Sequence, residues 1–185
     1  MEQLTLYRPE LDELSWRETW LSDPETMSYN HAYGGTIPFP RKRWAGWYAR
    51  WIRDGEGCYY RYLRLGENGE FVGNASYHYD EELGEYECEV LIYAPYRGRG
   101  FGRQGLALLC EAARANGVKR LVDNIAIDNP AAAMFLRGGF RERGRTEELI
   151  FLVKDLLIQV LKFFLVLSVR TASFKKKNAR PARAS

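Results

Sequence analysis

The chain has few of the residues that form disulfide frameworks or metal centres. It contains 3 cysteines and 2 histidines among 185 residues. Cys58, Cys88 and Cys110 are widely spaced, and none of them belongs to a paired metal-binding motif. An odd number of cysteines without a signal peptide favours reduced thiols in a cytoplasmic protein, and we expect no metal cofactor.

A strong charge imbalance and a long hydrophobic span are also lacking. The 27 Lys and Arg residues against 24 Asp and Glu residues give a net charge of only +3, so we expect no nucleic-acid partner. The most apolar run, residues 156–169, is shorter than the ~20 residues that a membrane-spanning helix needs. The composition, 46% hydrophobic and 28% charged, is that of an ordinary globular domain, and the chain is long enough for one domain with a substantial core.

The most distinctive stretch is Tyr96-Arg97-Gly98-Arg99-Gly100-Phe101-Gly102-Arg103. A strand-like run, residues 90–93, precedes it, and a helical pattern with apolar residues at 3.6-residue spacing follows it. The glycines therefore lie where a strand turns into a helix N-terminus, whose free N–H groups and dipole favour a bound phosphate. Glycine lets a ligand approach the backbone, and the three arginines match the charge of a pyrophosphate. The stretch predicts a pyrophosphate-binding loop; the alternative is a flexible surface loop.

Two familiar phosphate motifs do not fit. The stretch lacks the Gly-Lys-Ser/Thr ending of a P-loop, and it starts with arginine instead of the first glycine of a dinucleotide fingerprint. The pattern Arg97-x-x-Gly100-x-Gly102 instead resembles the coenzyme A signature Gln/Arg-x-x-Gly-x-Gly/Ala of the GNAT superfamily of N-acetyltransferases. The downstream Asp128-Asn129-Pro130-Ala131 and Gly139-Phe140 strengthen this resemblance, which covers about residues 3–156.

Periodicity, turn residues and caps predict the order of the elements. The expected strands are residues 4–7, 59–65, 70–79, 86–93, 118–127, 140–145 and 149–154. The expected helices lie near residues 11–21, from Pro24 onwards, at 41–53, after 103 and at 130–137, with a loop at 30–40. The resemblance implies the GNAT fold of the α/β (α+β) class: a mixed, mostly antiparallel central sheet, splayed between its fourth and fifth strands, with helices on both faces. Coenzyme A would enter the gap.

The resemblance also implies where acetyl-CoA binds. In the family, the backbone of the fourth strand pairs with the pantetheine arm, and Leu91, Ile92 and Tyr93 hold that place here. The pyrophosphate would lie against the N–H groups of the glycine-rich stretch, namely Arg97, Gly98, Arg99, Gly100, Phe101, Gly102 and Arg103. Asn129, or its neighbour Asp128, matches the polar residue that the family places against the cofactor, and both stay candidates.

Acetyl transfer to an amine needs a group that removes the ammonium proton. Glu87 and Glu89 alternate onto one face of the central strand, with Glu85 before them, and some relatives use a glutamate near this place as the base. Asp123 in the fifth strand is a further candidate, and the alternative is that these acids simply face solvent. We expect His78, a lone histidine in an aromatic strand, to be structural.

An acid that protonates the leaving thiolate is the point where the sequence departs from the family. Many relatives carry a tyrosine at the position of Phe135, and phenylalanine cannot donate a proton. Tyr93, Tyr77 or Tyr33 could replace it, the thiolate could leave unaided, or the protein could be catalytically silent.

These expectations define three alternatives for function. The first is an acetyl-CoA-dependent N-acetyltransferase that acts on the amine of a small molecule or a peptide, with acceptor specificity set by residues 23–53. The second is a silent acyl-CoA-binding or regulatory module, and the third is an interaction protein.

The sequence divides into a GNAT domain, residues 1–156, and a hydrophobic, then basic, extension, residues 157–185. We expect part of the extension to be disordered. Its apolar run could dock as a helix on the sheet or on a second subunit of a homodimer. It could also touch a membrane surface or have no function.

Overall fold

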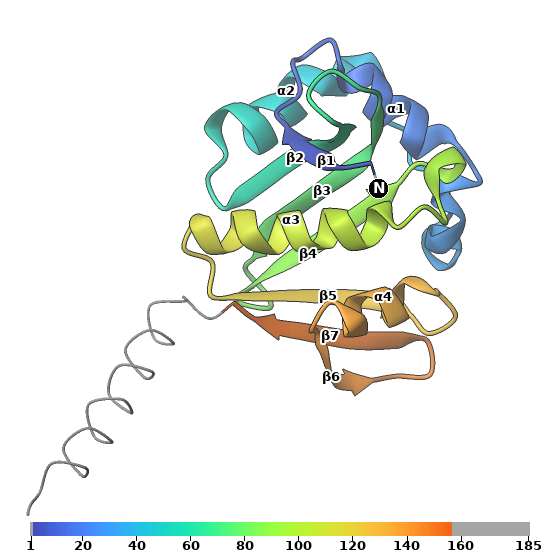
Figure 1. The fold of residues 1–185 in the computed structure, drawn as a ribbon, viewed down its shortest axis with the longest axis vertical. Helices are drawn as coiled ribbons and strands as arrows, with labels where there is room; N and C mark the ends of the chain where they lie inside the picture. Colours follow the sequence, from blue (N-terminus) through green and yellow to red (C-terminus); the bar gives the residue numbers. More distant parts are fainter. Residues whose placement is uncertain (1, 157–185) are drawn as a thin grey trace, which may run out of the picture.

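The computed structural model describes residues 2–156 of the chain, so the predictions for residues 157–185 lie outside the described residues. Figure 1 shows a central sheet of seven strands in the order β1-β2-β3-β4-β5-β7-β6. The strands are β1 Leu4–Tyr7, β2 Cys58–Leu65, β3 Phe71–Asp80, β4 Glu85–Ile92, β5 Arg120–Ala126, β6 Arg141–Arg145 and β7 Leu149–Asp155. Each one matches a predicted strand to within a few residues.

Helices occupy the connections from β1 to β2, from β4 to β5 and from β5 to β6. The α-helices are α1 Leu14–Ser22, α2 Trp44–Tyr48, α3 Phe101–Ala115 and α4 Ala131–Arg137. Short 3-10 segments are η1 Thr26–Tyr33, η2 Arg41–Arg43 and η4 Ala94–Tyr96, and a π-helical segment, η3, covers Ala49–Asp54. None of the helices within residues 2–156 is both long and apolar enough to cross a membrane.

The sheet is mixed and splays between β4 and β5, as predicted. These two strands are parallel and pair at only two positions, where Tyr86 lies opposite Leu121 and Glu87 opposite Val122. The neighbouring ladders, β3 with β4 and β5 with β7, are antiparallel and run over seven or more residue pairs each. Beyond Glu87 the facing edges of β4 and β5 therefore separate and leave a gap inside the sheet.

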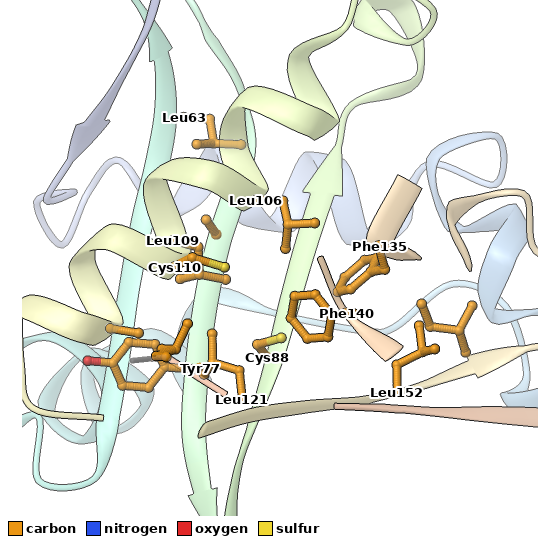
Figure 2. Close-up of a cluster of buried hydrophobic side chains, with 14 of the residues drawn as sticks. Leu63, Tyr77, Cys88, Leu106, Leu109, Cys110, Leu121, Phe135, Phe140 and Leu152 are labelled. Carbon is orange, nitrogen blue, oxygen red and sulfur yellow. The ribbon is translucent and has the colours of Figure 1, made fainter. Parts of the chain in front are cut away.

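Two hydrophobic clusters, one on each face, hold the helices to the sheet. On one face α3 lies over β3 and β4, and its predicted apolar stripe of Leu106, Leu109, Cys110 and Ala113 is buried, as Figure 2 shows in part. The α4 helix adds Phe135 to the same cluster. On the opposite face α1, η1, α2 and η3 pack over an aromatic cluster that includes Trp20, Trp44, Tyr60 and Tyr62. Helices thus cover both faces, and all three cysteines are free thiols.

The segment after α1 differs from the prediction of a helix from Pro24 and a loop from residue 30. It is a 3-10 helix from Thr26 to Tyr33, and the Asp23 carboxylate accepts a hydrogen bond from the Thr26 N–H at 3.0 Å. Arg97 donates to the carbonyl oxygens of Glu25 and Thr26, at 3.0 and 2.5 Å. The Glu25 carbonyl also accepts the Ser28 N–H at 3.3 Å, so a distant side chain and a tight turn of the backbone share this end of η1.

Candidate active site

A cleft of about 1190 Å³ occupies the gap between the splayed strands. Its walls come from β3, β4 and β5, from η1 and the aromatic side of η3, and from the starts of α3 and α4. Most of the residues selected from the sequence therefore meet in one place, although they come from segments far apart in the chain.

The glycine-rich stretch forms one end of the cleft. Gly98 and Gly100 have positive φ angles of 76° and 81°, which side chains other than glycine rarely adopt, and Gly100 is the residue just before α3. The first intrahelical bond of α3 is donated by Gln104 to the Gly100 carbonyl at 3.3 Å. The N–H groups of Phe101, Gly102 and Arg103 consequently have no partner inside the helix, and all three residues line the cleft. This end has the geometry expected of a phosphate site.

The three arginines of the stretch have different surroundings. Arg97 lines the cleft, but its guanidinium is used to hold η1 against the end of β4, where it also donates to the Ile92 carbonyl at 3.2 Å. Arg99 does not line the cleft; it pairs with Glu2 at 2.5 Å and lies over the Phe101 ring. Arg103 is exposed and lines the cleft. Of the three, Arg103 is thus the best placed to meet a phosphate charge.

The open edge of β4 faces the cleft beyond its short pairing with β5. The Tyr93 N–H donates to the Val72 carbonyl of β3 at 2.9 Å. Because backbone groups alternate in direction along an antiparallel ladder, those of Ile92 and Val90 point away from β3, towards the open side. Leu91 and Ile92 line the cleft and Tyr93 does not. Val90, which the sequence did not single out, completes the free edge.

The loop after β5 closes the same end of the cleft. The Asn129 side-chain oxygen accepts a hydrogen bond from the Ala131 N–H at 2.9 Å and so caps α4. Asp128 lies 3.5 Å from the ring nitrogen Nε2 of His31, a residue of η1. Both Asp128 and Asn129 line the cleft, so both remain candidates for contact with the cofactor.

Carboxylates gather where β4 and β5 begin to diverge. Glu87 accepts a hydrogen bond from the Asn124 amide at 3.2 Å and lies 3.8 Å from His78. Glu89 accepts a hydrogen bond from the Asn74 amide at 2.7 Å. Glu87, Glu89 and His78 all line the cleft. The His78 ring also packs against the Trp51 ring, with ring centroids 5.4 Å apart.

Asp123 adds a third carboxylate from the opposite strand. Its side chain is half-buried and lines the cleft. Burial raises the pKa of the Asp123 carboxyl well above its ordinary value, and the negative charges of Glu87 and Glu89 raise it further. The three carboxylates therefore interact electrostatically, and Asp123 is the member whose pKa moves towards the range that suits a base at neutral pH.

Phe135 is 2% exposed, contributes to the cleft wall and packs edge-on against Phe140 with ring centroids 4.9 Å apart. Figure 2 shows the two rings side by side in the core below α3. Of the suggested replacement acids, Tyr77 and Tyr93 do not line the cleft, and the side chain of Tyr33 lies outside the described part. The family's tyrosine therefore has no substitute among those two.

Besides Val90, Tyr29 and Arg17 are cleft residues that were not recognised individually from the sequence. Tyr29 of η1 lines the cleft, and the pKa of its phenol is raised by burial and then by the charge of Glu89. Arg17 of α1 lies on the acceptor side of the cleft among aromatic rings. Tyr29 falls within residues 23–53, to which acceptor specificity was assigned from the sequence. Arg17 lies outside that range, between Trp16 and Trp20, and has no local signal.

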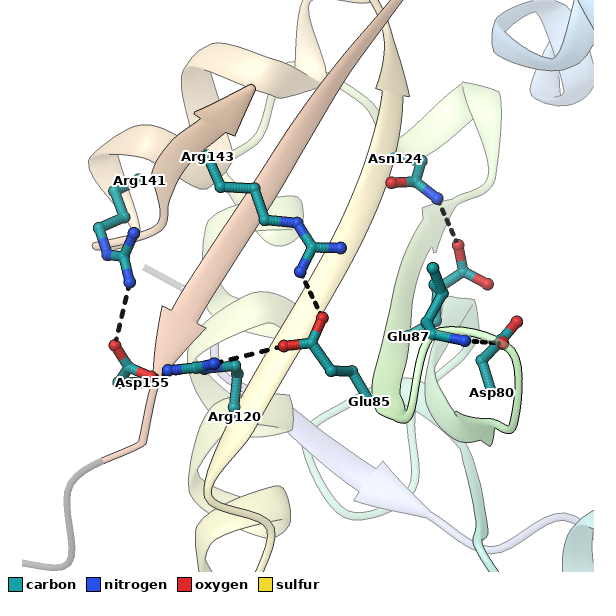
Figure 3. Close-up of polar contacts among 9 residues, drawn as sticks. Asp80, Glu85, Glu87, Arg120, Asn124, Arg141, Arg143 and Asp155 are labelled. Atoms are coloured by element: carbon teal, nitrogen blue, oxygen red, sulfur yellow. Dashed lines mark hydrogen bonds and ion pairs between the residues drawn. The ribbon is translucent and has the colours of Figure 1, made fainter. Parts of the chain in front are cut away.

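One group of side chains has the spacing of metal ligands. Ligand atoms of His78, Asp80 and Glu87 lie within 4.8 Å of one another. Asp80 also accepts a hydrogen bond from the Leu83 N–H at 2.8 Å, which Figure 3 includes. That no metal takes part remains a prediction.

A sheet that opens between two parallel central strands, with a glycine-rich helix start at one end of the gap, is the architecture of an acetyltransferase. The chain belongs to the GNAT acetyltransferase family, because the profile of the acetyltransferase (GNAT) domain matches residues 3–141. The resemblance of the sequence to the GNAT superfamily is confirmed, and the chain is assigned to the N-acetyltransferases.

Individual relatives agree with this assignment. The chain is 33% identical over 84 residues to YycN of Bacillus subtilis (strain 168), an uncharacterised N-acetyltransferase, in a match that spans 43% of this chain and about half, 53%, of the relative. Its fold is similar to spermidine N-acetyltransferase from Vibrio cholerae in complex with CoA and spermine, with a TM-score of 0.66, 18% identity and coverage of 83% and 96% of the two chains. It is also similar to the putative acetyltransferase yncA from Salmonella typhimurium with acetyl-CoA, with a TM-score of 0.62, 23% identity and coverage of 83% and 94%.

Proposed function

We propose that the protein transfers the acetyl group of acetyl-CoA to the primary amine of a small molecule or peptide in the cytoplasm. The observation that carries this proposal is the single cleft that joins a helix N-terminus with free N–H groups to a group of three carboxylates. A phosphate site at one end and proton acceptors at the other are the two requirements of the reaction. Coenzyme A bound to fold relatives supports the identity of the donor.

The donor would bind along the glycine-rich end. The N–H groups of Phe101, Gly102 and Arg103 are suited to the pyrophosphate, with the Arg103 guanidinium adding charge. The backbone groups of Val90 and the Ile92 N–H on the open edge of β4 are suited to the amide groups of the pantetheine arm, which would pair with them as a strand does. The Ile92 carbonyl already accepts the Arg97 guanidinium at 3.2 Å. This places the thioester near the point where β4 and β5 separate.

The acceptor would enter from the side of η1 and η3. A protonated amine is attracted by Glu87, Glu89 and Asp123, and it must lose a proton before it can attack a carbonyl carbon. Asp123 is suited to take this proton, directly or through water, because burial and the charges of Glu87 and Glu89 raise its pKa and so make the carboxylate a stronger base. Glu87 and Glu89 would position the amine and keep the Asp123 pKa high; each is an alternative base.

The departing thiolate needs little help. Free thiols have a pKa of ~8.5, so the thiolate is a tolerable leaving group at neutral pH without an acid at Phe135. The phenol of Tyr29, close enough to Glu89 and Asp123 for their charges to affect its pKa, is suited to donate a proton if one is required.

A silent acyl-CoA-binding module is the second candidate, and the buried phenylalanine at position 135 favours it. Release of free CoA that depends on an added amine separates the two. Amine-dependent release supports the transferase, whereas acetyl-CoA binding without release for any amine of a broad panel supports the module.

The donor site is tested with two arginines of the same loop. Arg103→Ala should weaken acetyl-CoA binding in a calorimetric titration by about 10-fold, since a charge-assisted contact is lost. Arg99→Ala is the matched control, because Arg99 is turned towards Glu2, outside the cleft. Equal affinities for the two variants would contradict the placement of the pyrophosphate.

A further inference from the structure

Arg17 brings a half-buried positive charge into the acceptor side of the cleft. Its guanidinium carbon lies 4.5 Å from the centre of the Trp47 ring, 5.1 Å from that of Tyr60 and 5.2 Å from that of Phe39. Aromatic faces attract a cation, but they do not provide hydrogen-bond acceptors for the N–H groups that lie in the plane of the guanidinium. The surroundings hold the side chain in place and leave most of its donors unused.

The hydrogen-bond partners of Arg17 are fewer than its donors. Its Nη1 donates to the Tyr60 hydroxyl at 3.2 Å, and its Nε is buried without a partner among residues 2–156. Within the same residues no carboxylate lies within 4.0 Å to form an ion pair with it. A guanidinium carries five N–H donors, and a buried charge without a counter-ion is costly.

Two other arginines provide a comparison. Arg64 and Arg114 also have a buried Nε without a partner, and Arg64 also lies over an aromatic ring, that of Tyr7. Neither residue lines the cleft, whereas Arg17 does. Among the three, only Arg17 could therefore offer its remaining guanidinium N–H groups to a molecule bound in the cleft.

Negative charge lies near Arg17 but does not pair with it directly. Burial lowers the pKa of the Arg17 guanidinium, but Tyr60 and Glu89 outweigh burial, so the pKa is raised and the group stays charged. The Glu89 carboxylate itself accepts the amide of Asn74 at 2.7 Å. The acceptor side of the cleft thus offers a cation at Arg17 and anions at Glu87, Glu89 and Asp123 to one ligand.

We propose that Arg17 binds a carboxylate of the acceptor, so that the substrate is a small amine that also carries a carboxylate. This inference rests on the proposed function. The fork of the guanidinium matches the two oxygens of a carboxylate, while the acidic group receives the ammonium of the same molecule. A polyamine would satisfy the acids but would place further positive charge beside an unpaired guanidinium, which disfavours it.

The test compares acceptors that differ only in the carboxylate. The pairs are phenylalanine with 2-phenylethylamine and alanine with ethylamine, and spermine serves as the polyamine. The wild-type protein should show a kcat/KM at least about 10-fold higher for the amino acid of each pair, from one charge-assisted contact. Equal values, or a preference for the amines or spermine, would overturn the inference while leaving acetyl transfer intact.

Substitution of Arg17 connects the preference to this side chain. Arg17→Met, similar in length and uncharged, should reduce the ratio of the two kcat/KM values by about 10-fold, to a value near 1, because the contact that causes the preference is lost. Arg17→Lys keeps the charge without the fork and should reduce the ratio less. Arg64→Met is the matched control and should keep the wild-type ratio. Acetyl-CoA affinity shows whether Arg17→Met is folded. If the folded variant keeps the preference for the amino acids, the assignment is overturned. If Arg17→Met does not fold, an undiminished ratio in Arg17→Lys overturns it.

A binding measurement separates this inference from the proposed function. If no acceptor is turned over, phenylalanine and 2-phenylethylamine are titrated calorimetrically into the wild-type protein and Arg17→Met with CoA present. If the wild-type protein binds phenylalanine but not 2-phenylethylamine, and Arg17→Met does not bind phenylalanine, the inference is supported although the transferase proposal fails. Absence of phenylalanine binding, or binding that does not depend on Arg17, overturns it.

Discussion

The Asn124 side-chain amide donates a hydrogen bond to the Glu87 carboxylate at 3.2 Å, across the point where β4 and β5 separate (Figure 3). Only two residue pairs join these strands, so this bond adds a side-chain link at the base of the gap. It fixes one oxygen of Glu87, and the second oxygen lies 3.8 Å from His78. Glu87 is therefore held in place next to Asp123, whose pKa it raises.

We predict that Glu87→Gln shifts the acidic limb of the pH–rate profile to lower pH. The base must be deprotonated to work, so the rate rises with pH through the Asp123 pKa. Removing the Glu87 charge removes one cause that raises this pKa, whereas glutamine still accepts the Asn124 hydrogen bond. The measurement is kcat/KM between about pH 5 and 9 with an accepted amine.

A matched control is Glu142→Gln, since Glu142 pairs with Arg145 on β6 and does not line the cleft. Its profile should stay at the wild-type position. A profile of Glu87→Gln with an unmoved acidic limb would exclude Asp123 as the titrating base. A loss of roughly 10²–10⁴-fold at every pH would instead identify Glu87 as the base.

Asp123→Asn should stabilise the fold near neutral pH while slowing acetyl transfer. The pKa of Asp123 is raised in the folded protein, so the unfolded chain loses this proton first as the pH rises above about 3.8. Between that pH and the raised pKa the folded state holds more protons, and stability falls with rising pH. Asparagine cannot ionise, so this decline should disappear.

The check is the melting temperature of both proteins from about pH 4 to 8. A gain of a few degrees at neutral pH is expected, because 1 kcal/mol corresponds to about 2–4 °C at this size. If Asp123→Asn melts at a lower temperature than the wild type at neutral pH, the carboxylate contributes bonds that outweigh its burial.

Local patterns predicted the strands and the glycine-rich loop because their causes are local. Asn68-Gly69 separates β2 from β3, and the spacing of Leu106, Leu109 and Cys110 defines the buried face of α3. A left-handed residue at Gly100 needs glycine whatever the rest of the chain does. These features could be inferred from a few neighbouring residues.

The parts that the sequence did not predict depend on distant contacts. The start of η1 is held by Arg97, which is 71 residues away from the Thr26 carbonyl that it binds. Arg17 faces the cleft because the aromatic rings of Phe39, Trp47 and Tyr60 surround it, and these rings come from three other segments. Neither arrangement has a signal in the residues adjacent to it.

Arg97→Ala should destabilise the fold although Arg97 belongs to the signature of the donor site. Its guanidinium donates to three carbonyl oxygens, those of Glu25, Thr26 and Ile92. Loss of these bonds should lower the free energy of unfolding by roughly 1–2 kcal/mol, because hydrogen bonds to a charged group are lost. Arg97→Lys should restore only part, since a lysine cannot reproduce the fork.

Urea denaturation measures this effect, with Arg103→Ala as the control in the same loop. Arg103 is exposed, and its loss should leave the unfolding free energy close to the wild-type value. If Arg97→Ala is as stable as the wild type, the arginine serves the ligand and not η1.

Phe135→Tyr should destabilise the protein without accelerating the reaction. The Phe135 ring is 2% exposed and packs against Phe140 in the cluster beneath α3, so an added hydroxyl would have to find a partner among apolar side chains. A buried hydroxyl without a partner costs roughly 1–3 kcal/mol. Melting temperature and turnover of Phe135→Tyr are measured side by side, with Phe140→Tyr as a control for a hydroxyl in the same cluster. A stable Phe135→Tyr with clearly faster transfer would show that the hydroxyl reaches the cleft, where it could protonate the thiolate, and that the wild-type site lacks an acid it could use.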